Sequence, residues 1–148
     1  MKLQNIIGYG IILGVIAIIA GTHWTAQANK RQVYTVMFER GTTIDPDDIA
    51  IIDVVVARMM ENDHLEAVIV GHTGTRGDPT QNAALSNRRS EFIAKAMEDL
   101  GISEHRLSTF GAGDTNPLSE IDGEHPRAYQ KRLSRAEIVV TNPNHWGW

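Results

Sequence analysis

The glycine-rich stretch from Gly71 to Pro79 carries the residue types in this chain that are best suited to binding chemistry. Its sequence is Gly-His-Thr-Gly-Thr-Arg-Gly-Asp-Pro, and it lies between a predicted strand and a predicted helix. Backbone N–H groups in that position can cradle an anion at the start of the helix. The Gly-x-x-Gly-x-x-Gly spacing matches neither glycine pattern of nucleotide-binding loops, and the loop contains no lysine. The pattern therefore permits an anion site but argues against a nucleotide.

The sequence contains no catalytic constellation. It has no cysteine, which excludes disulfides, a cysteine nucleophile and cysteine-based zinc sites. It has no Gly-x-Ser-x-Gly motif, and its six histidines include no closely spaced pair that would suit a metal ion. His72 could act as a base or a metal ligand, but a loop histidine held by backbone groups is the commoner arrangement. We therefore predict a non-enzymatic protein without a metal or a cofactor.

The charge distribution separates a short apolar segment from a charged domain. The chain of 148 residues has a net charge of −4, which argues against nucleic acid as a partner, because phosphate binding requires a basic face. Residues 1–28 contain one charged side chain, Lys2, whereas residues 29–148 contain 13 basic and 18 acidic residues. The second segment is long enough to bury roughly two-thirds of its unfolded surface and to fold as one domain.

Residues 1–28 have the composition of an export or membrane segment. Residues 6–21 are uncharged, and as a helix rising about 1.5 Å per residue they span roughly 24 Å. Extension to Trp24 adds an aromatic residue of the kind found at membrane interfaces. One interpretation is a membrane anchor formed by residues 6–24. The other is a signal peptide cleaved after Ala28, because Ala-Gln-Ala precedes that point as a small-x-small site.

Both interpretations place residues 29–148 outside the cytoplasm. A buried core helix is the remaining alternative, and it is disfavoured because no polar stripe interrupts the segment. An exported domain without cysteine is typical of the bacterial periplasm. We therefore expect a cell-envelope protein whose domain lies in the periplasm, either anchored in the inner or outer membrane or released after cleavage at Ala28.

Alternating strand and helix patterns follow along the charged segment. Strands are predicted where β-branched and other apolar residues cluster, at residues 33–38, 66–71, 106–110 and 136–140. Helices are predicted where apolar residues recur at helical spacing, at about residues 45–60, 80–100 and 127–133. Residues 41–44 and 111–126 are predicted to be loops and connectors. This β-α-β-α-β order with a final strand predicts one α/β sandwich, preceded by an N-terminal hydrophobic helix.

The same periodicity predicts the core and the helix ends. The apolar positions of the first two helices are expected to face the core: Ile52, Val55, Val56, Met59 and Met60, then Leu85, Phe92, Ile93, Ala96, Met97 and Leu100. Asp45 is expected to cap the first helix, and Gly101 to end the second. The acids at residues 45–48 do not have the spacing of a calcium-binding EF-hand loop.

Several spaced motifs resemble the OmpA-like (OmpA/MotB C-terminal) domain family. Gly71-His72-Thr73-Gly74, followed after ten residues by Leu85-Ser86 and then by Arg89, is similar to the family's Gly-His-Thr-Asp, Leu-Ser and Arg pattern. Further matches are Asn82 ahead of Leu-Ser, the Gly-x-Gly loop at residues 110–117, and the closing Arg-Ala-Glu-Ile at residues 135–138. The likeness covers residues 33–140 and leaves residues 141–148 as a tail.

This resemblance implies non-covalent binding of bacterial peptidoglycan through the diaminopimelate of its stem peptide. That group carries an ammonium and a carboxylate on one carbon, so a binder needs an anion and a cation at a fixed separation. In the family, the aspartate of Gly-His-Thr-Asp faces the ammonium, and the arginine takes both carboxylate oxygens. The resemblance therefore indicates a ligand site at these residues: His72, Thr73, Gly74, Asn82, Arg89 and Arg135. We add Asp78, from the same loop, as a candidate to replace the aspartate.

The sequence departs from the family at Gly74, which stands where the aspartate is expected. Three explanations are open: Asp78 swings in to replace the carboxylate, the domain binds peptidoglycan weakly or binds another wall group, or it has kept the fold without the ligand. Each charged residue also has a structural interpretation. Asp78 is a natural helix-start residue before Pro79, and Arg89 could form a salt bridge that pins the second helix.

We therefore expect a non-enzymatic envelope protein that links a membrane or an envelope complex to peptidoglycan. The alternative is a structural or assembly subunit of an envelope complex, with the same fold and a lost wall-binding site. In that case the N-terminal segment and the tail would bind the protein partners. The tail contains two tryptophans, Trp146 and Trp148, which either anchor to a partner or membrane surface or pack on the sheet.

Overall fold

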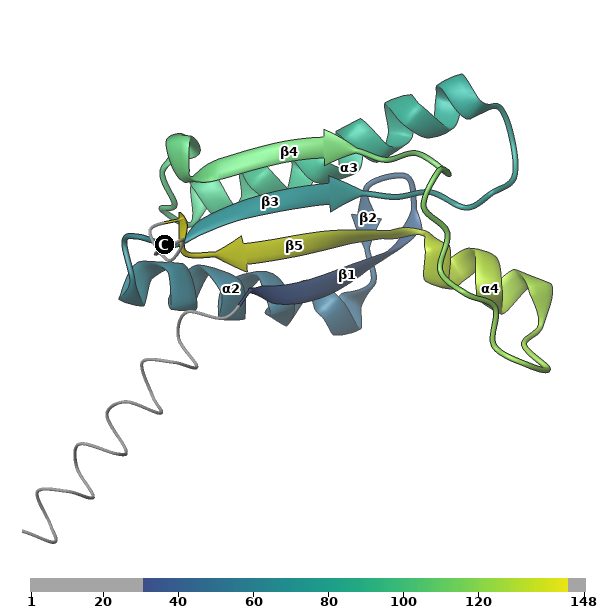
Figure 1. Cartoon of the computed structure of the whole chain (residues 1–148), viewed down its shortest axis with the longest axis horizontal. Coiled ribbons are helices and arrows are strands. Elements are labelled where there is room, and N and C mark those ends of the chain that lie inside the picture. Colours follow the sequence, from purple (N-terminus) through teal and green to yellow (C-terminus); the bar gives the residue numbers. More distant parts are fainter. Residues whose placement is uncertain (1–30, 144–148) are drawn as a thin grey trace, which may run out of the picture. The chain divides into compact units, whose positions relative to one another are not determined.

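The computed structural model describes residues 31–143, so the predicted segment 1–28 and the tryptophans of the tail lie outside the described residues. Figure 1 shows a five-stranded sheet with two long helices behind it. The elements in chain order are β1 (Gln32–Arg40), β2 (Thr43–Ile44), a 3₁₀ turn (Pro46–Asp48), α2 (Ile49–Glu61), β3 (Glu66–Gly71), α3 (Pro79–Asp99), a second 3₁₀ turn (Glu104–Arg106), β4 (Leu107–Gly111), α4 (Pro126–Leu133) and β5 (Arg135–Thr141).

The sheet has the order β2-β1-β5-β3-β4. Strands β3 and β4 pair in parallel, whereas β5 pairs antiparallel with both β1 and β3. The predicted mixed α/β fold is confirmed, and the last strand lies in the middle of the sheet. The sequence predicts a loop at residues 41–44, which is wrong for β2, because Thr43–Ile44 pair with the end of β1. A two-residue strand contains no alternation for a sequence pattern to detect.

Helices α2 and α3 bury their inner faces against the sheet. The core residues that they contribute are Ile52, Val55, Val56, Met59, Ile93, Ala94 and Met97. The prediction that Met60, Phe92 and Leu100 belong to the core is wrong, since they are 54%, 44% and 44% exposed. In α3 the small residues Ser86 and Ser90 are fully buried, so the packed face is rotated away from the apolar stripe.

The helix ends follow the predicted chemistry. The Asp45 carboxylate accepts a hydrogen bond from the Asp47 backbone N–H and so caps the 3₁₀ turn that leads into α2. Gly101 ends α3 with a φ of 104°, a conformation that side-chain-bearing residues rarely adopt. Across residues 31–143, no helix has both the length and the hydropathy that crossing a bilayer requires.

The topology brings several loops to one edge of the sheet. Strands β1, β3 and β4 run in the same direction, so their carboxyl ends share one edge, where Figure 1 shows the arrowheads of β3 and β4. Helix α3 packs closely enough on β3 that a Cβ at Gly71 would lie 1.9 Å from the Ser86 carbonyl oxygen. This close approach carries the middle of α3, including Arg89, to the same edge.

Candidate functional site

Arg89 is held rigidly where β1 and β3 end, and it is only 3% exposed. Its Nε donates to the Gly41 carbonyl oxygen at 2.8 Å, and its Nη1 donates to the His72 carbonyl oxygen at 2.6 Å. The guanidinium also lies over the ring of Phe38, 4.8 Å from its centroid. The side chain therefore fastens the β1–β2 turn to the start of the glycine-rich loop.

The charge of Arg89 has no counter-ion in the described part of the chain, where every ion pair involves other residues. The predicted salt bridge is thus replaced by backbone carbonyls. Burial lowers the pKa of Arg89 to about 10, so the side chain stays charged at neutral pH. Its Nη2 makes no hydrogen bond within residues 31–143 and is not a fully buried atom. The site presents a fixed cation with N–H donors available to an anion.

His72 and Thr73 lie at the base of the site and are 1% and 4% exposed. Their backbone N–H groups donate to the carbonyl oxygens of Arg135 and Gly113. Neither His72 ring nitrogen nor the Thr73 hydroxyl has a hydrogen-bond partner within the described residues. Burial lowers the pKa of His72, and the nearby charge of Arg135 lowers it further. The Glu137 carboxylate, whose Oε2 lies 3.9 Å from the His72 Nε2, raises the pKa by a smaller amount. His72 is therefore a buried residue that is neutral at pH 7.

Gly74 faces α4 rather than open solvent. A Cβ added there would lie 2.3 Å from Oε1 of Gln130. The same Oε1 accepts a hydrogen bond from the Thr75 backbone N–H at 3.0 Å, and the Gln130 Nε2 donates to the Thr75 hydroxyl at 3.0 Å. The amide of Gln130 therefore occupies the space into which a side chain at position 74 would extend.

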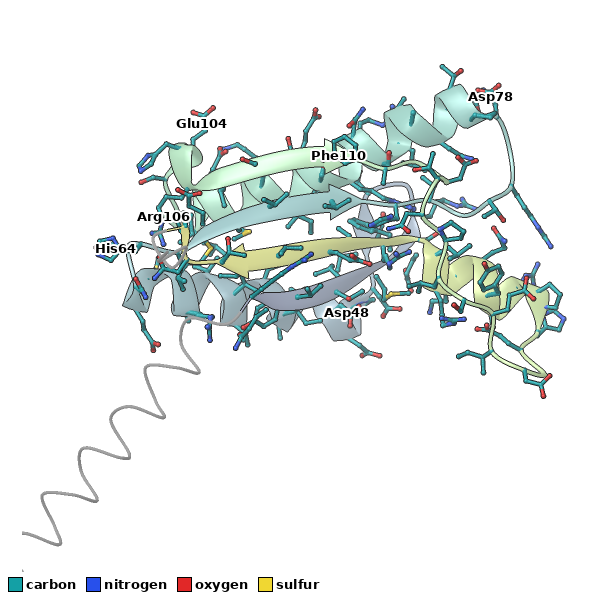
Figure 2. The ribbon with its side chains drawn as sticks, viewed as in Figure 1. Asp48, His64, Asp78, Glu104, Arg106 and Phe110 are labelled. Atoms are coloured by element: carbon teal, nitrogen blue, oxygen red, sulfur yellow. The ribbon has the colours of Figure 1, made fainter. Side chains whose placement is uncertain are left out.

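Asp78 and Asn82 shape the loop from the α3 side. The Asp78 carboxylate caps α3 by accepting from the Gln81 backbone N–H at 2.9 Å, and Figure 2 shows Asp78 at the outer end of that helix. The Asn82 Nδ2 donates to the Arg76 carbonyl oxygen and to the Asp114 carboxylate, both at 3.2 Å. Asn82 therefore joins the two glycine-containing loops.

Arg135 at the start of β5 is engaged by protein groups. It is 2% exposed, and its Nε donates to the Glu137 carboxylate at 2.8 Å. Arg132, three residues earlier and within α4, pairs with both oxygens of Glu124 at 2.6 and 2.7 Å. Of the arginines near this edge, Arg89 is thus the buried one without a carboxylate partner in the described residues.

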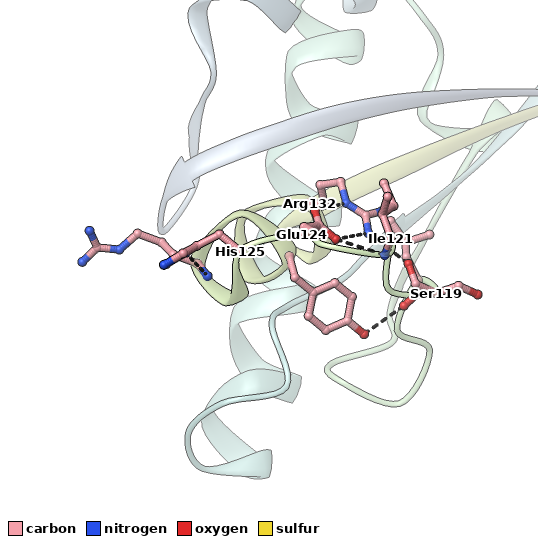
Figure 3. A network of polar contacts seen from close by, with 8 residues as sticks. Ser119, Ile121, Glu124, His125 and Arg132 are labelled. Carbon is pink, nitrogen blue, oxygen red and sulfur yellow. Dashed lines mark hydrogen bonds and ion pairs between the residues drawn. The ribbon is translucent and has the colours of Figure 1, made fainter.

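The connector before α4 folds back onto that helix, as Figure 3 shows. Arg132 also donates to the Ser119 carbonyl oxygen, and the Tyr129 hydroxyl donates to the Leu118 carbonyl oxygen. Between this connector, α4 and the glycine-rich loop lies a polar pocket of about 190 Å³. Its lining residues are Thr75, Arg76, Glu120, Glu124, Pro126, Tyr129 and Gln130.

The structure brings His72, Thr73, Gly74 and Arg89 together and leaves Asp78 on the outer end of α3. Sequence reasoning missed Gln130 and Glu137, which contact the loop residues Thr75 and His72, and Glu120, which lines the pocket beside the loop. All three lie more than 40 residues beyond the glycine-rich loop along the chain. Within residues 31–143, no group of three or more histidine and acidic side chains could hold a metal ion.

Comparisons with known proteins match this chain to one protein family. The model of the OmpA family matches residues 37–131. The chain is 23% identical over 113 residues to the peptidoglycan-associated lipoprotein of Legionella pneumophila, covering 76% of this chain and 64% of that relative.

Two solved structures share the fold. The crystal structure of the peptidoglycan-associated lipoprotein from Burkholderia pseudomallei has a TM-score of 0.64 at 21% identity, and the match covers 72% of this chain and 89% of that one. The cell wall anchor of the T6SS from Pseudomonas aeruginosa has a TM-score of 0.61 at 18% identity, and the match covers 85% of this chain and 96% of that one.

Proposed function

This chain belongs to the OmpA family, and on that premise we propose that it binds peptidoglycan non-covalently through the diaminopimelate of the stem peptide. The domain, residues 33–140, then links a membrane or an envelope complex to the cell wall without catalysing a reaction. The names of the similar proteins support this proposal, since one is a peptidoglycan-associated lipoprotein and another a cell wall anchor.

The observation that carries the proposal is the buried, unpaired charge of Arg89. A cation removed from water without a counter-ion is costly, and an incoming carboxylate relieves that cost. Backbone carbonyls already fix two of its nitrogens, so the side chain loses little conformational freedom when it binds an anion. The free Nη2 is the donor that we assign to the ligand's carboxylate.

The ligand's ammonium lacks the usual partner, because Gly74 has no side chain. Loss of one charge-assisted hydrogen bond costs about 1.5–3 kcal/mol, or roughly ten- to a hundredfold in affinity. We infer weaker wall binding than a domain with both charges would have. The same observation favours the alternative function, an assembly subunit of an envelope complex, since Gln130 fills the space beside Gly74.

We further propose that the domain lies in the periplasm. Residues 6–24 would anchor it in the inner or outer membrane, or cleavage after Ala28 would release it. Envelope proteins are the expected partners besides peptidoglycan.

Co-sedimentation of the full chain, kept soluble in mild detergent, with purified diaminopimelate-type sacculi tests this function. We expect the parent protein to sediment with the sacculi and the Arg89→Ala variant to lose at least ten-fold in affinity. Arg88→Ala is the matched control, because Arg88 is the exposed neighbour on α3.

Arg89→Lys separates binding from folding, since lysine keeps the charge but not the planar fork of donors. Circular dichroism melts establish that each variant is folded. A folded Arg89→Ala variant that sediments like the parent would contradict the proposed contact. A parent protein that stays in solution would favour the assembly subunit instead.

A further inference from the structure

The side chain of Gln130 stands where a residue at position 74 would project. Its Oε1 lies 2.3 Å from the position of a Cβ on Gly74, and its amide makes two hydrogen bonds to Thr75. A carbonyl oxygen has two lone pairs, and Thr75 uses one of them. The Gln130 oxygen can therefore accept a second hydrogen bond from a donor that enters beside the loop.

The polar pocket beside Gln130 gives such a donor a way in. It opens between the Thr75–Arg76 segment of the loop and the connector that precedes α4. The connector is tied to α4 by the contacts of Arg132 and Tyr129 that Figure 3 shows, so this wall of the pocket is fixed. A small polar group fits a space of about 190 Å³.

Most polar side chains of the lining are already engaged. Both oxygens of Glu124 accept from Arg132, and the hydroxyl of Tyr129 donates to a backbone carbonyl. Glu120 is different, because within residues 31–143 its carboxylate has no hydrogen bond or ion pair. Arg76 likewise has no side-chain partner in the described residues, and it supplies the positive charge of the lining.

We propose that this chain receives its ligand's ammonium on the α4 side of the loop, through the Glu120 carboxylate and the Gln130 amide oxygen. Glu120 provides the negative charge that position 74 lacks, and Gln130 provides a fixed neutral acceptor. Arg89, joined to the same loop through His72, holds the carboxylate. This inference rests on the proposed function and names the residues that determine specificity in this chain.

Four single variants of the full chain, assayed with the same sacculi, test the assignment. We expect Glu120→Gln to weaken binding about three- to tenfold, with Glu104→Gln, an exposed acid on the second 3₁₀ turn, as the matched control. Gln130→Glu puts a carboxylate at the acceptor position and is expected to strengthen binding by a similar factor. Arg76→Gln removes a cation next to the ammonium and is also expected to strengthen it.

The outcomes separate this inference from the function on which it rests. If Arg89→Ala abolishes sedimentation while Glu120→Gln matches Glu104→Gln, wall binding stands and the assignment of the ammonium is overturned. If the Arg76→Gln variant binds sacculi more weakly than the parent, the pocket holds the ligand's carboxylate, and the assignment of the ammonium is also overturned. If the parent does not sediment at all, the proposed function and this inference fail together.

Discussion

Gly74→Asp is expected to restore the missing carboxylate only when Gln130 is shortened as well. The backbone at Gly74 does not have the positive φ that would penalise a side chain, so the substitution is not strained locally. The obstacle is the Gln130 amide, whose oxygen lies 2.3 Å from the new Cβ position. The aspartate must therefore displace this flexible side chain.

The cost of that displacement follows from the contacts that it breaks. The Gln130 amide makes two hydrogen bonds to Thr75, each 3.0 Å long. A hydrogen bond contributes about 0.5–1.5 kcal/mol net, and water replaces part of it at an exposed position. We expect Gly74→Asp alone to lower the free energy of unfolding by about 1–2 kcal/mol. That corresponds to a fall of roughly 4–10 °C in Tm.

A double-mutant cycle with Gln130→Ala measures this coupling. In the Gln130→Ala background the obstacle is gone, so Gly74→Asp is expected to cost close to nothing. The coupling energy between the two positions is then about 1–2 kcal/mol in chemical denaturation. The double variant is also expected to bind sacculi about tenfold more tightly than the parent, because a charged acceptor again faces the ammonium.

Two results would refute this reasoning. Additive stabilities, with a coupling energy within about 0.3–0.5 kcal/mol of zero, would mean that the Gln130 amide does not occupy the space beside Gly74. A folded double variant that binds sacculi no more tightly than Gln130→Ala alone would mean that position 74 does not face the ligand.

Three further predictions concern the frame of the site. Gly71→Ala is expected to lower the free energy of unfolding by about 3 kcal/mol in urea titrations, because its Cβ would lie 1.9 Å from the Ser86 carbonyl oxygen. A loss below about 1 kcal/mol would contradict this close packing of α3 on β3. Asp78→Ala is expected to lower the free energy of unfolding by about 1 kcal/mol, because α3 loses its N-terminal cap. Asp122→Ala in the connector is the control and is expected to cause no loss, so equal Tm values for the two variants would contradict the capping role. The pKa of His72 is lowered in the folded state, so the unfolded chain takes up a proton first as pH falls below about 6.5. Tm should therefore fall between pH 6.5 and 5, and His72→Phe should flatten this part of the profile; an unchanged slope would show that His72 does not titrate on unfolding.

Much of the fold could be predicted because its elements carry strong local signals. The strand at Glu66–Gly71 and the helix ends at Asp45 and Gly101 are set by residues within a few positions of each other. The errors arise where packing between distant segments determines which residues are buried. The apolar stripe of α3 predicts buried Phe92 and Leu100, but close packing of the helix on β3 selects its small residues for the core instead.

The site was only partly accessible from the sequence, for the same physical reason. The motif locates Arg89 and Gly74, but no local pattern shows that Arg89 is bound by the carbonyls of Gly41 and His72. Nor does spacing reveal that Gln130, 55 residues beyond Thr75, closes the loop. Such partners are chosen by the topology, which brings the ends of β1, β3 and β4 and the start of β5 to one edge.

The position of Arg89 makes the two candidate functions experimentally separable. Its contacts with Gly41 and His72 connect two loops, so an assembly subunit without a ligand would still lose stability in Arg89→Ala. Such a structural role does not require Nη2, because Nε and Nη1 make both of these contacts. A wall-binding role does require Nη2, because it is the nitrogen whose N–H groups are both left for an anion. Arg89→Lys retains the charge with a single donor group, so it should lose affinity for sacculi by more than its loss of stability explains. A lysine variant with parental affinity would give Arg89 a purely structural role and would overturn its assignment to the ligand's carboxylate.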